Sequence, residues 1–127
     1  MSNEISYQIR MGLVNGNLSD SFSTASLRVD QNTARLVRNT QPIGTTAELI
    51  EAGDIGTPGW SMFANISETD TDEIEIGNYT GGTFYPFMLL KAGEYQICRL
   101  AITTAQLYAK GNNGVDDVVL FYIIYND

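Results

Sequence analysis

The sequence predicts an all-β fold: one antiparallel β-sandwich domain, jelly-roll-like, built from about eight short strands. Three observations lead to this prediction. Apolar and polar residues alternate along much of the chain, turn residues recur at intervals of roughly 10 residues, and no stretch shows a helical period. A chain of 127 residues is the size of one domain, and no linker or repeat divides it, so we expect residues 1–127 to form a single unit.

The N-terminal third contains the clearest alternating strand. Apolar residues occupy every second position from 5 to 13: Ile5, Tyr7, Ile9, Met11 and Leu13. This alternation is typical of a strand with one buried and one solvated face. Asn15-Gly16 supplies a tight turn, because such pairs adopt positive φ readily. Further strands are expected over 22–29 and 34–38, while residues 46–51 fit either a strand or one helical turn.

The middle of the chain continues the same pattern. Residues 54–59 form a loop by composition, and Gly81-Gly82 forms a turn. Between them, alternation predicts one strand from Trp60, Met62, Ala64 and Ile66, and another from Ile74 and Ile76 with Glu73 and Glu75 on an acidic outer face. Residues 84–90 are apolar on both faces. Because Pro86 lacks an N–H group, this run is expected to be an edge strand or to carry a bulge.

The C-terminal third ends in a strongly apolar strand. Residues 91–94 and 111–114 have turn composition, and strands are expected over 95–102 and 107–110. Residues 118–125 are apolar on both faces. A strand of that kind needs cover on both sides, so we expect one side to face the core and the other a subunit contact.

Residue counts argue against an enzyme. The chain has no His, which removes the commonest general base and every Ser-His or Cys-His pair. The single Cys, Cys98, excludes an intrachain disulfide and a Cys-rich zinc site, and we interpret it as a small core residue. No glycine-rich phosphate loop is present. We therefore expect no catalytic residues, no cofactor and no metal.

The charge balance disfavours nucleic acid as a partner. The formal net charge is -8, whereas affinity for DNA or RNA depends on neutralising phosphates. No apolar run approaches the ~20 residues that cross a bilayer, and the N-terminus does not resemble a signal peptide, so we expect a soluble protein made in a cytoplasm, without a membrane partner. Four basic residues precede position 46, and they could favour docking on an acidic neighbour unless the two halves interleave: Arg10, Arg28, Arg35 and Arg38.

Two groups of residues leave alternatives open. The acidic residues between Glu68 and Glu75 could supply oxygens for Ca²⁺. However, Glu73 stands where the Ca²⁺-loop pattern needs Gly and Tyr79 where it needs Glu, which favours a solvated acidic turn. The aromatic residues, among them Trp60 and Tyr79, could form a sugar-binding platform, fill the core or make protein contacts.

The order of strands and turns resembles that of small structural proteins of tailed bacteriophages. The segments that carry the resemblance follow the alternating first strand: Gly44–Ile50, Gly53–Ile55, Pro58–Trp60, Gly77–Tyr79, Leu90–Glu94 and Leu107–Lys110. No single motif is diagnostic. The resemblance implies a β-sandwich that decorates or cements the capsid or sits on the tail, and that works by surface contacts without catalysis.

These observations predict a non-enzymatic structural protein of a virion, and the favoured role is that of a capsid decoration or cement protein. The alternatives are a tail or head-fibre component, a carbohydrate-binding β-sandwich module or a Ca²⁺-dependent binding domain. The expected partners are the major capsid protein or other virion subunits, with homo-oligomer formation, and the expected location is the virion, assembled in the host cytoplasm. The predicted contact residues are Phe121, Tyr122, Ile124, Tyr125, Arg28, Arg35 and Arg38.

Overall fold

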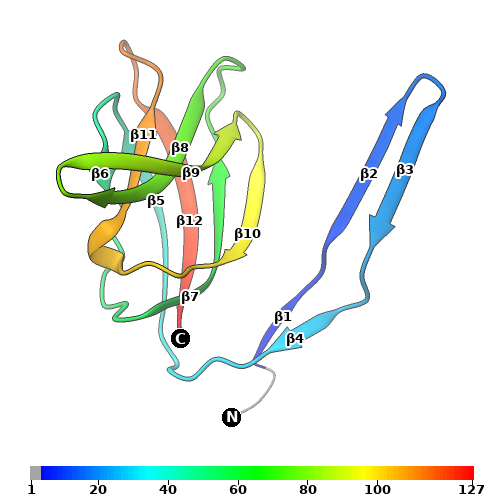
Figure 1. The fold of residues 1–127 in the computed structure, drawn as a ribbon, viewed down its shortest axis with the longest axis horizontal. Coiled ribbons are helices and arrows are strands. Elements are labelled where there is room, and N and C mark those ends of the chain that lie inside the picture. The colour runs from blue at the N-terminus through cyan, green and yellow to red at the C-terminus, as the bar shows by residue number, and fades with distance from the viewer. Residues whose placement is uncertain (1–3) are drawn as a thin grey trace. The chain divides into compact units, whose positions relative to one another are not determined.

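The computed structural model describes residues 4–127 and is built almost entirely from β-strands (Figure 1). The chain divides into two compact units, residues 1–32 and residues 33–127. The predicted sandwich is confirmed in the second unit, so it is shorter than the expected span of 1–127. No helix within the described residues is long and apolar enough to cross a membrane.

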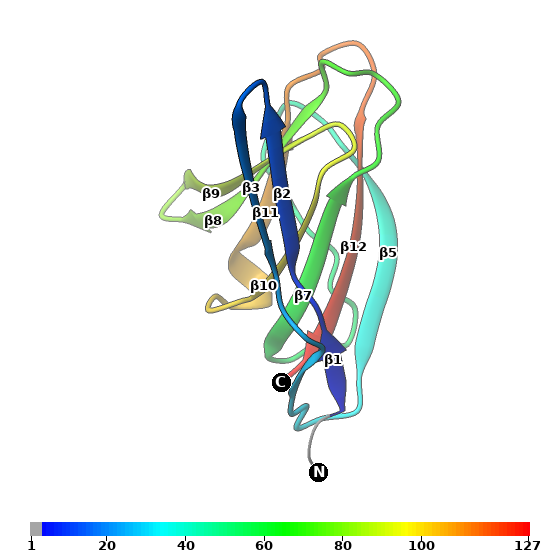
Figure 2. The same ribbon diagram turned by 90° about the vertical axis from the view of Figure 1, so that its right-hand side faces the viewer.

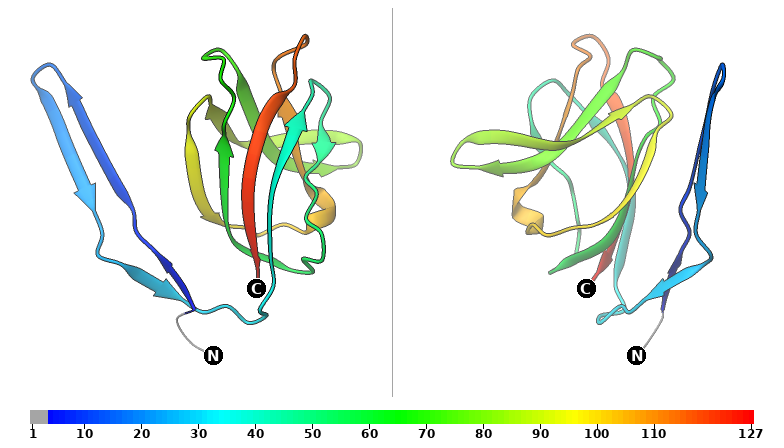
Figure 3. Two further views of the ribbon diagram at one scale, coloured as in Figure 1. Left: turned by 180° about the vertical axis from the view of Figure 1, so that it is seen from behind. Right: turned by 45° about the vertical axis from the view of Figure 1, so that its right-hand side comes forward.

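The sandwich consists of two four-stranded sheets in which all neighbouring strands are antiparallel. Sheet I has the order β5 (Leu36–Ile43), β12 (Val118–Asn126), β7 (Pro58–Asn65), β10 (Tyr95–Arg99). Sheet II has the order β6 (Glu48–Leu49), β11 (Leu107–Gly111), β8 (Glu73–Thr80), β9 (Thr83–Lys91). In Figure 3, left, the red β12 runs between β5 and β7.

The connections follow the order of a jelly roll. From β5 to β8 each strand lies in the sheet opposite its predecessor, β8 and β9 form a hairpin within sheet II, and β10, β11 and β12 alternate between the sheets again. This eight-stranded path with two Greek keys defines the jelly roll. The predicted architecture is therefore confirmed for residues 33–127.

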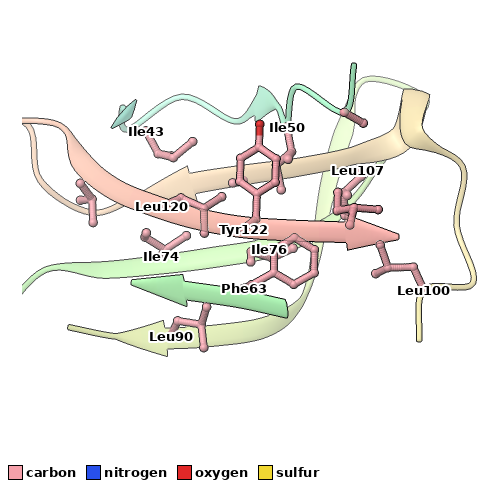
Figure 4. Packing of buried hydrophobic residues seen from close by; sticks show 14 of the residues in the cluster. Ile43, Ile50, Phe63, Ile74, Ile76, Leu90, Leu100, Leu107, Leu120 and Tyr122 are labelled. Carbon is pink, nitrogen blue, oxygen red and sulfur yellow. The ribbon is translucent and has the colours of Figure 1, made fainter. Parts of the chain in front are cut away.

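The core lies between the two sheets. Even-numbered residues of β12 point inward, and Tyr122 and Phe63 are the largest of the fully buried side chains (Figure 4). Isoleucines of β8, Ile74 and Ile76, pack against them from sheet II, while Glu73 and Glu75 face outward as predicted. Most of the cluster is aliphatic, so packing of sheet I on sheet II supplies the main hydrophobic stabilisation.

Some predicted boundaries were wrong. The strand expected over 22–29 is broken into β3 (Leu18–Ser23) and β4 (Leu27–Val29), and the strand expected over 34–38 begins later and continues to Ile43. The prediction for Pro86 is confirmed in both respects. Strand β9 is an edge strand of sheet II, and its register with β8 shifts next to Pro86.

The first unit is a two-stranded hairpin. Strand β1 (Ile5–Tyr7) pairs with β4. Strand β2 (Arg10–Asn15) pairs with β3 (Figure 2), and the turn between them contains Gly16, whose φ is 59°. The alternation in residues 5–13 predicted one buried face. In the structure every residue of β2 and β3 is exposed, because a two-stranded ribbon has no second layer of its own.

A polar network anchors Tyr122 at one end of the core. Its hydroxyl donates a hydrogen bond to the backbone carbonyl of Glu51 and accepts one from Asn39 Nδ2 at 3.3 Å. The side-chain oxygen of Gln41 accepts from the backbone N–H of Glu51 at 3.1 Å, and Gln41 Nε2 donates to the carbonyl of Leu49 at 2.9 Å. The network ties β5, β6 and β12 together.

This network predicts an alkaline loss of stability. Burial raises the pKa of Tyr122, the negative charge of Glu51 adds to the rise, and the Asn39 hydrogen bond opposes it. The folded state therefore favours the neutral phenol, and its contribution is fully present below pH ~10 and is lost as pH rises through the higher folded-state pKa. We expect Tyr122→Phe to lower the free energy of unfolding at pH 8 by about 1–2 kcal/mol and to weaken its decline towards pH 11.

Urea unfolding at both pH values measures this effect. The control is Tyr85→Phe, because the Tyr85 side chain is exposed and outside the core. It should leave the stability at pH 8 nearly unchanged. An equal pH dependence in the wild type and Tyr122→Phe would contradict the assignment.

Candidate subunit-contact surface

The outer surface of sheet I is apolar on β12 and β7 and mixed on its two edge strands, where Arg38 and Thr40 of β5 and Arg99 of β10 lie among apolar residues. The cross-strand register shows which side chains share this surface, since directly opposed residues point to the same side. Tyr95, Ala64 and Phe121 form one row, and Ile97, Met62 and Ile123 form the next. We call this surface the outer apolar face, and its apolar members are Leu36, Trp60, Met62, Ala64, Tyr95, Ile97, Val119, Phe121, Ile123 and Tyr125.

Solvent reaches much of this surface. Tyr95 is 63% exposed and Leu36 is 61% exposed, and most of the side chains between them are partly accessible, whereas Ala64 is fully covered. The outer side of sheet II carries more charge, because Glu73, Glu75 and Lys110 alternate there with inward-facing residues, although Leu89 opposite Glu75 is also 50% exposed. An antiparallel sheet with one solvated side normally carries such polar residues. Contiguous exposed apolar surface marks sites of interaction with other molecules.

Two arginines border the outer apolar face. The guanidinium of Arg38 lies 5.7 Å from the ring centroid of Phe121, and that of Arg99 lies 5.7 Å from the ring of Trp60. Arg99 also forms an ion pair with Asp127 at 3.2 Å. Aromatic and Arg side chains are enriched in protein–protein interfaces, so the composition of this surface is that of an interface.

The structure divides the predicted contact residues of β12 between two surfaces. Phe121 and Tyr125 lie on the outer apolar face, as a contact surface requires. Tyr122 and Ile124 are fully buried in the core, so their assignment to a subunit contact is corrected. Because residues 118–125 are apolar on both sides, the sequence did not show which of them face outward. Alternation along the strand places Ile123 on the same side as Phe121 and Tyr125, although it was not among the predicted contact residues.

The structure also separates the three predicted contact arginines. Arg38 lies opposite Ile123 on the outer apolar face. Arg35 precedes β5, and its Nη1 donates to the carbonyl of Asp54 at 3.5 Å. Arg28 belongs to β4 of the hairpin unit, opposite Ser6, and is not part of the sandwich surface.

The contact surface also contains residues of the neighbouring strands that the sequence did not predict. Met62 and Ile97 face each other across β7 and β10, in the same row as Ile123. Their alternation within residues 60–66 and 95–97 is visible in the sequence. This alternation alone does not predict an outer surface, because the sequence of a single strand does not reveal which of its sides faces the core.

The other candidate residues serve structural roles or lie apart. Cys98 packs against the core, and burial raises the pKa of its thiol, which disfavours the reactive thiolate. Within residues 4–127 no three acidic, His or Cys side chains group as metal ligands. In the acidic stretch, Asp72 is buried and accepts a hydrogen bond from Asn113 Nδ2 at 3.1 Å, so its carboxylate helps to hold a turn.

The aromatic residues divide between the two sheets. On the outer side of sheet II, Tyr79 and Tyr108 stack with ring centroids 4.5 Å apart and an interplanar angle of 18°. Each ring therefore already has one side covered by the other ring. Trp60, Tyr95 and Phe121 belong to the outer apolar face, where they lie among aliphatic side chains.

The fold and this surface define a class of molecule: a jelly-roll sandwich with an apolar outer surface on sheet I, together with an amphipathic hairpin. Comparison of the chain with protein-family models, curated proteins and solved structures found no match. The resemblance to phage structural proteins stays a prediction.

Proposed function

We propose that this protein is a non-enzymatic structural subunit of a virion, acting as a capsid decoration or cement protein through contacts with neighbouring subunits. The observation that carries the proposal is the outer apolar face, which spans all four strands of sheet I. The virion setting comes from the resemblance in strand and turn order, and the contact role comes from the surface.

The architecture suits such a role. Eight paired strands around a mostly aliphatic core form a rigid domain, because closely packed interiors resist deformation. A subunit repeated many times on a shell gains binding strength from multivalency even when each contact is weak. The net charge of -8 helps to keep the free subunit dispersed before assembly.

Location in particles tests the proposal. Particles banded in caesium chloride from the host that carries this gene would be labelled with a gold-conjugated antibody to this chain. Label in many copies over heads supports decoration, and label on tails or head fibres supports the alternative positions. Absence of the chain from purified particles would refute a virion role, and binding on a glycan array would then favour the carbohydrate-binding alternative.

A charge placed on the outer apolar face should prevent incorporation. Ile97 is 42% exposed on β10, so Ile97→Glu can fold, yet its carboxylate would lose water in any contact made by this surface. We expect at least about a tenfold loss of copies per particle, since buried unpaired charges commonly cost that much or more. Quantitative mass spectrometry of the particles measures the loss.

The matched control uses sheet II. Leu89 is 50% exposed on the outer side of β9, opposite Glu75, so Leu89→Glu introduces the same group on the other sheet. It should be incorporated like the wild type. Equal incorporation of Ile97→Glu and the wild type would show that the outer apolar face is not the contact surface.

A further inference from the structure

The hairpin of the first unit has one apolar and one polar side. The pairing of β2 with β3 places Met11 opposite Phe22 and Leu13 opposite Asp20, with Leu18 and Asn15 completing this side. The other side carries Arg10, Gly12, Val14, Ser19, Ser21 and Ser23. We call the first side the hairpin apolar face.

The hairpin apolar face has no cover within its own unit. Its four apolar side chains, Met11, Leu13, Leu18 and Phe22, are between 45% and 71% exposed. A two-stranded ribbon has no second layer, and an isolated hairpin is at best marginally stable in water. Alternation as regular as that of residues 5–13 stabilises a strand only when its apolar side is buried. Burial of this face therefore requires another surface.

Charge indicates which surface is complementary to the hairpin apolar face. Asp20 is the only charged residue on the hairpin apolar face, and it forms no ion pair with any residue in 4–127. On the outer apolar face, Arg38 stacks over Phe121 and likewise has no acidic partner among the described residues. A carboxylate in an apolar contact needs a cation beside it, and Arg is the cation suited to such contacts.

The dimensions of the two faces also agree. The six-residue strands β2 and β3 extend about 20 Å at 3.3 Å per residue. The four strands of sheet I, spaced about 4.8 Å apart, span about 14 Å between the axes of the outermost strands, and the nine-residue β12 extends about 30 Å, so the sheet is large enough to receive the hairpin. Sheets pack on sheets through side chains of this kind, about 10 Å apart.

We propose that the hairpin apolar face of one copy packs on the outer apolar face of a second copy, with Asp20 beside Arg38, so that the protein assembles by exchanging hairpins. Each copy supplies one hairpin and one receiving surface. Two copies related by a two-fold axis can therefore each cover the hairpin apolar face of the other. The inference rests on the proposed function, which treats the outer apolar face as a contact surface, and it names a second copy as the molecule bound there.

Sedimentation equilibrium of the full chain tests the assembly. We expect a mass of twice 14.0 kDa for the wild type at micromolar concentration. Phe22→Glu on the hairpin apolar face should raise the dissociation constant at least tenfold. The control Ser21→Glu adds the same charge to the adjacent residue on the polar side of the hairpin and should assemble like the wild type.

A charge exchange tests the predicted pair. Asp20→Arg alone and Arg38→Asp alone should each weaken self-association at least tenfold. An equimolar mixture of the two variants should recover the dimer, because the hairpin arginine of one variant meets the aspartate at position 38 of the other, and the native Asp20 and Arg38 meet in the reciprocal contact. A contact made within one chain cannot be rescued by mixing.

Several outcomes would overturn the inference: a mass of one chain at every concentration, a dimer that is indifferent to Phe22→Glu, or a mixture that fails to recover. These results are separable from those on the function. A chain that exchanges hairpins yet is absent from particles refutes the virion role alone, and a chain found in particles but monomeric in solution refutes the exchange alone.

Discussion

Gly77→Ala is expected to lower the free energy of unfolding by about 3 kcal/mol or more, as do changes that force backbone segments apart in a packed structure. A Cβ atom at position 77 would lie 2.2 Å from the carbonyl oxygen of Tyr85 and 2.6 Å from the Cα of Pro86. Both are backbone atoms of β9, so the clash cannot be relieved by rotating a side chain. The strand itself would have to move.

The crowding at Gly77 arises from the bulge in β9. Ile76 pairs with Met88 and Gly77 with Pro86, so Phe87 is an extra residue on β9. A bulge bends the strand that contains it, and here the bend brings the β9 backbone against Gly77. Glycine is required at this position for its lack of a side chain, since its φ is not positive.

Urea unfolding of the variant and a matched glycine control measures the effect. Gly114 also has no positive φ, and a Cβ there would have no atom within 4 Å, so Gly114→Ala should change the stability by no more than about 1 kcal/mol. If both variants unfold at the wild-type urea concentration, the close approach of β9 to β8 is refuted.

Asn65→Ala is expected to cost on the order of 3 kcal/mol, because it leaves several buried backbone groups without partners. Asn65 is fully buried at the end of β7. Its Nδ2 donates to the carbonyls of Asp72 at 3.0 Å and Leu90 at 3.1 Å, and its Oδ1 accepts from the N–H of Ser67 at 3.1 Å. One amide thus joins β7 of sheet I to β9 of sheet II and to the residue before β8.

For Asn65→Ala, both the melting temperature and the urea concentration at the unfolding midpoint should fall, because the amide connects the two sheets. The control is Asn17→Ala in the hairpin turn, where the exposed side chain makes no hydrogen bond to the described residues. It should leave the unfolding of the sandwich unchanged. A loss below about 1 kcal/mol for Asn65→Ala would mean that water replaces the amide and that the two sheets do not depend on it.

Local chemistry made some features predictable. Pro86 lacks a donor, so an edge strand or a bulge followed directly from its structure, and both are present. Ile74 and Ile76 alternate with glutamates, so their inward direction was also predictable. In each case the deciding property belongs to one residue or to a short run of neighbours in the sequence.

Predicting the contact surface requires the pairing of several strands, which the sequence does not supply. Residues 118–125 indicated two covered sides, yet they did not tell Phe121 and Tyr125 from Tyr122 and Ile124. That distinction requires the register of β12 with β7, because Ala64 opposite Phe121 faces outward whereas Phe63 opposite Tyr122 is in the core. A shift of one residue would exchange the two sets completely.

The sequence alone predicted an all-β protein of short strands and tight turns. It also showed that the chain has no His and a single Cys. Alternation and turn residues act over a few positions, which is why they can be recognised without a structure. Only the tertiary structure decided which side of each strand faces the core, where the backbone of β9 closely approaches Gly77, and that residues 4–32 form a hairpin in a unit of their own. These features depend on pairing between distant segments, whose register no local pattern specifies.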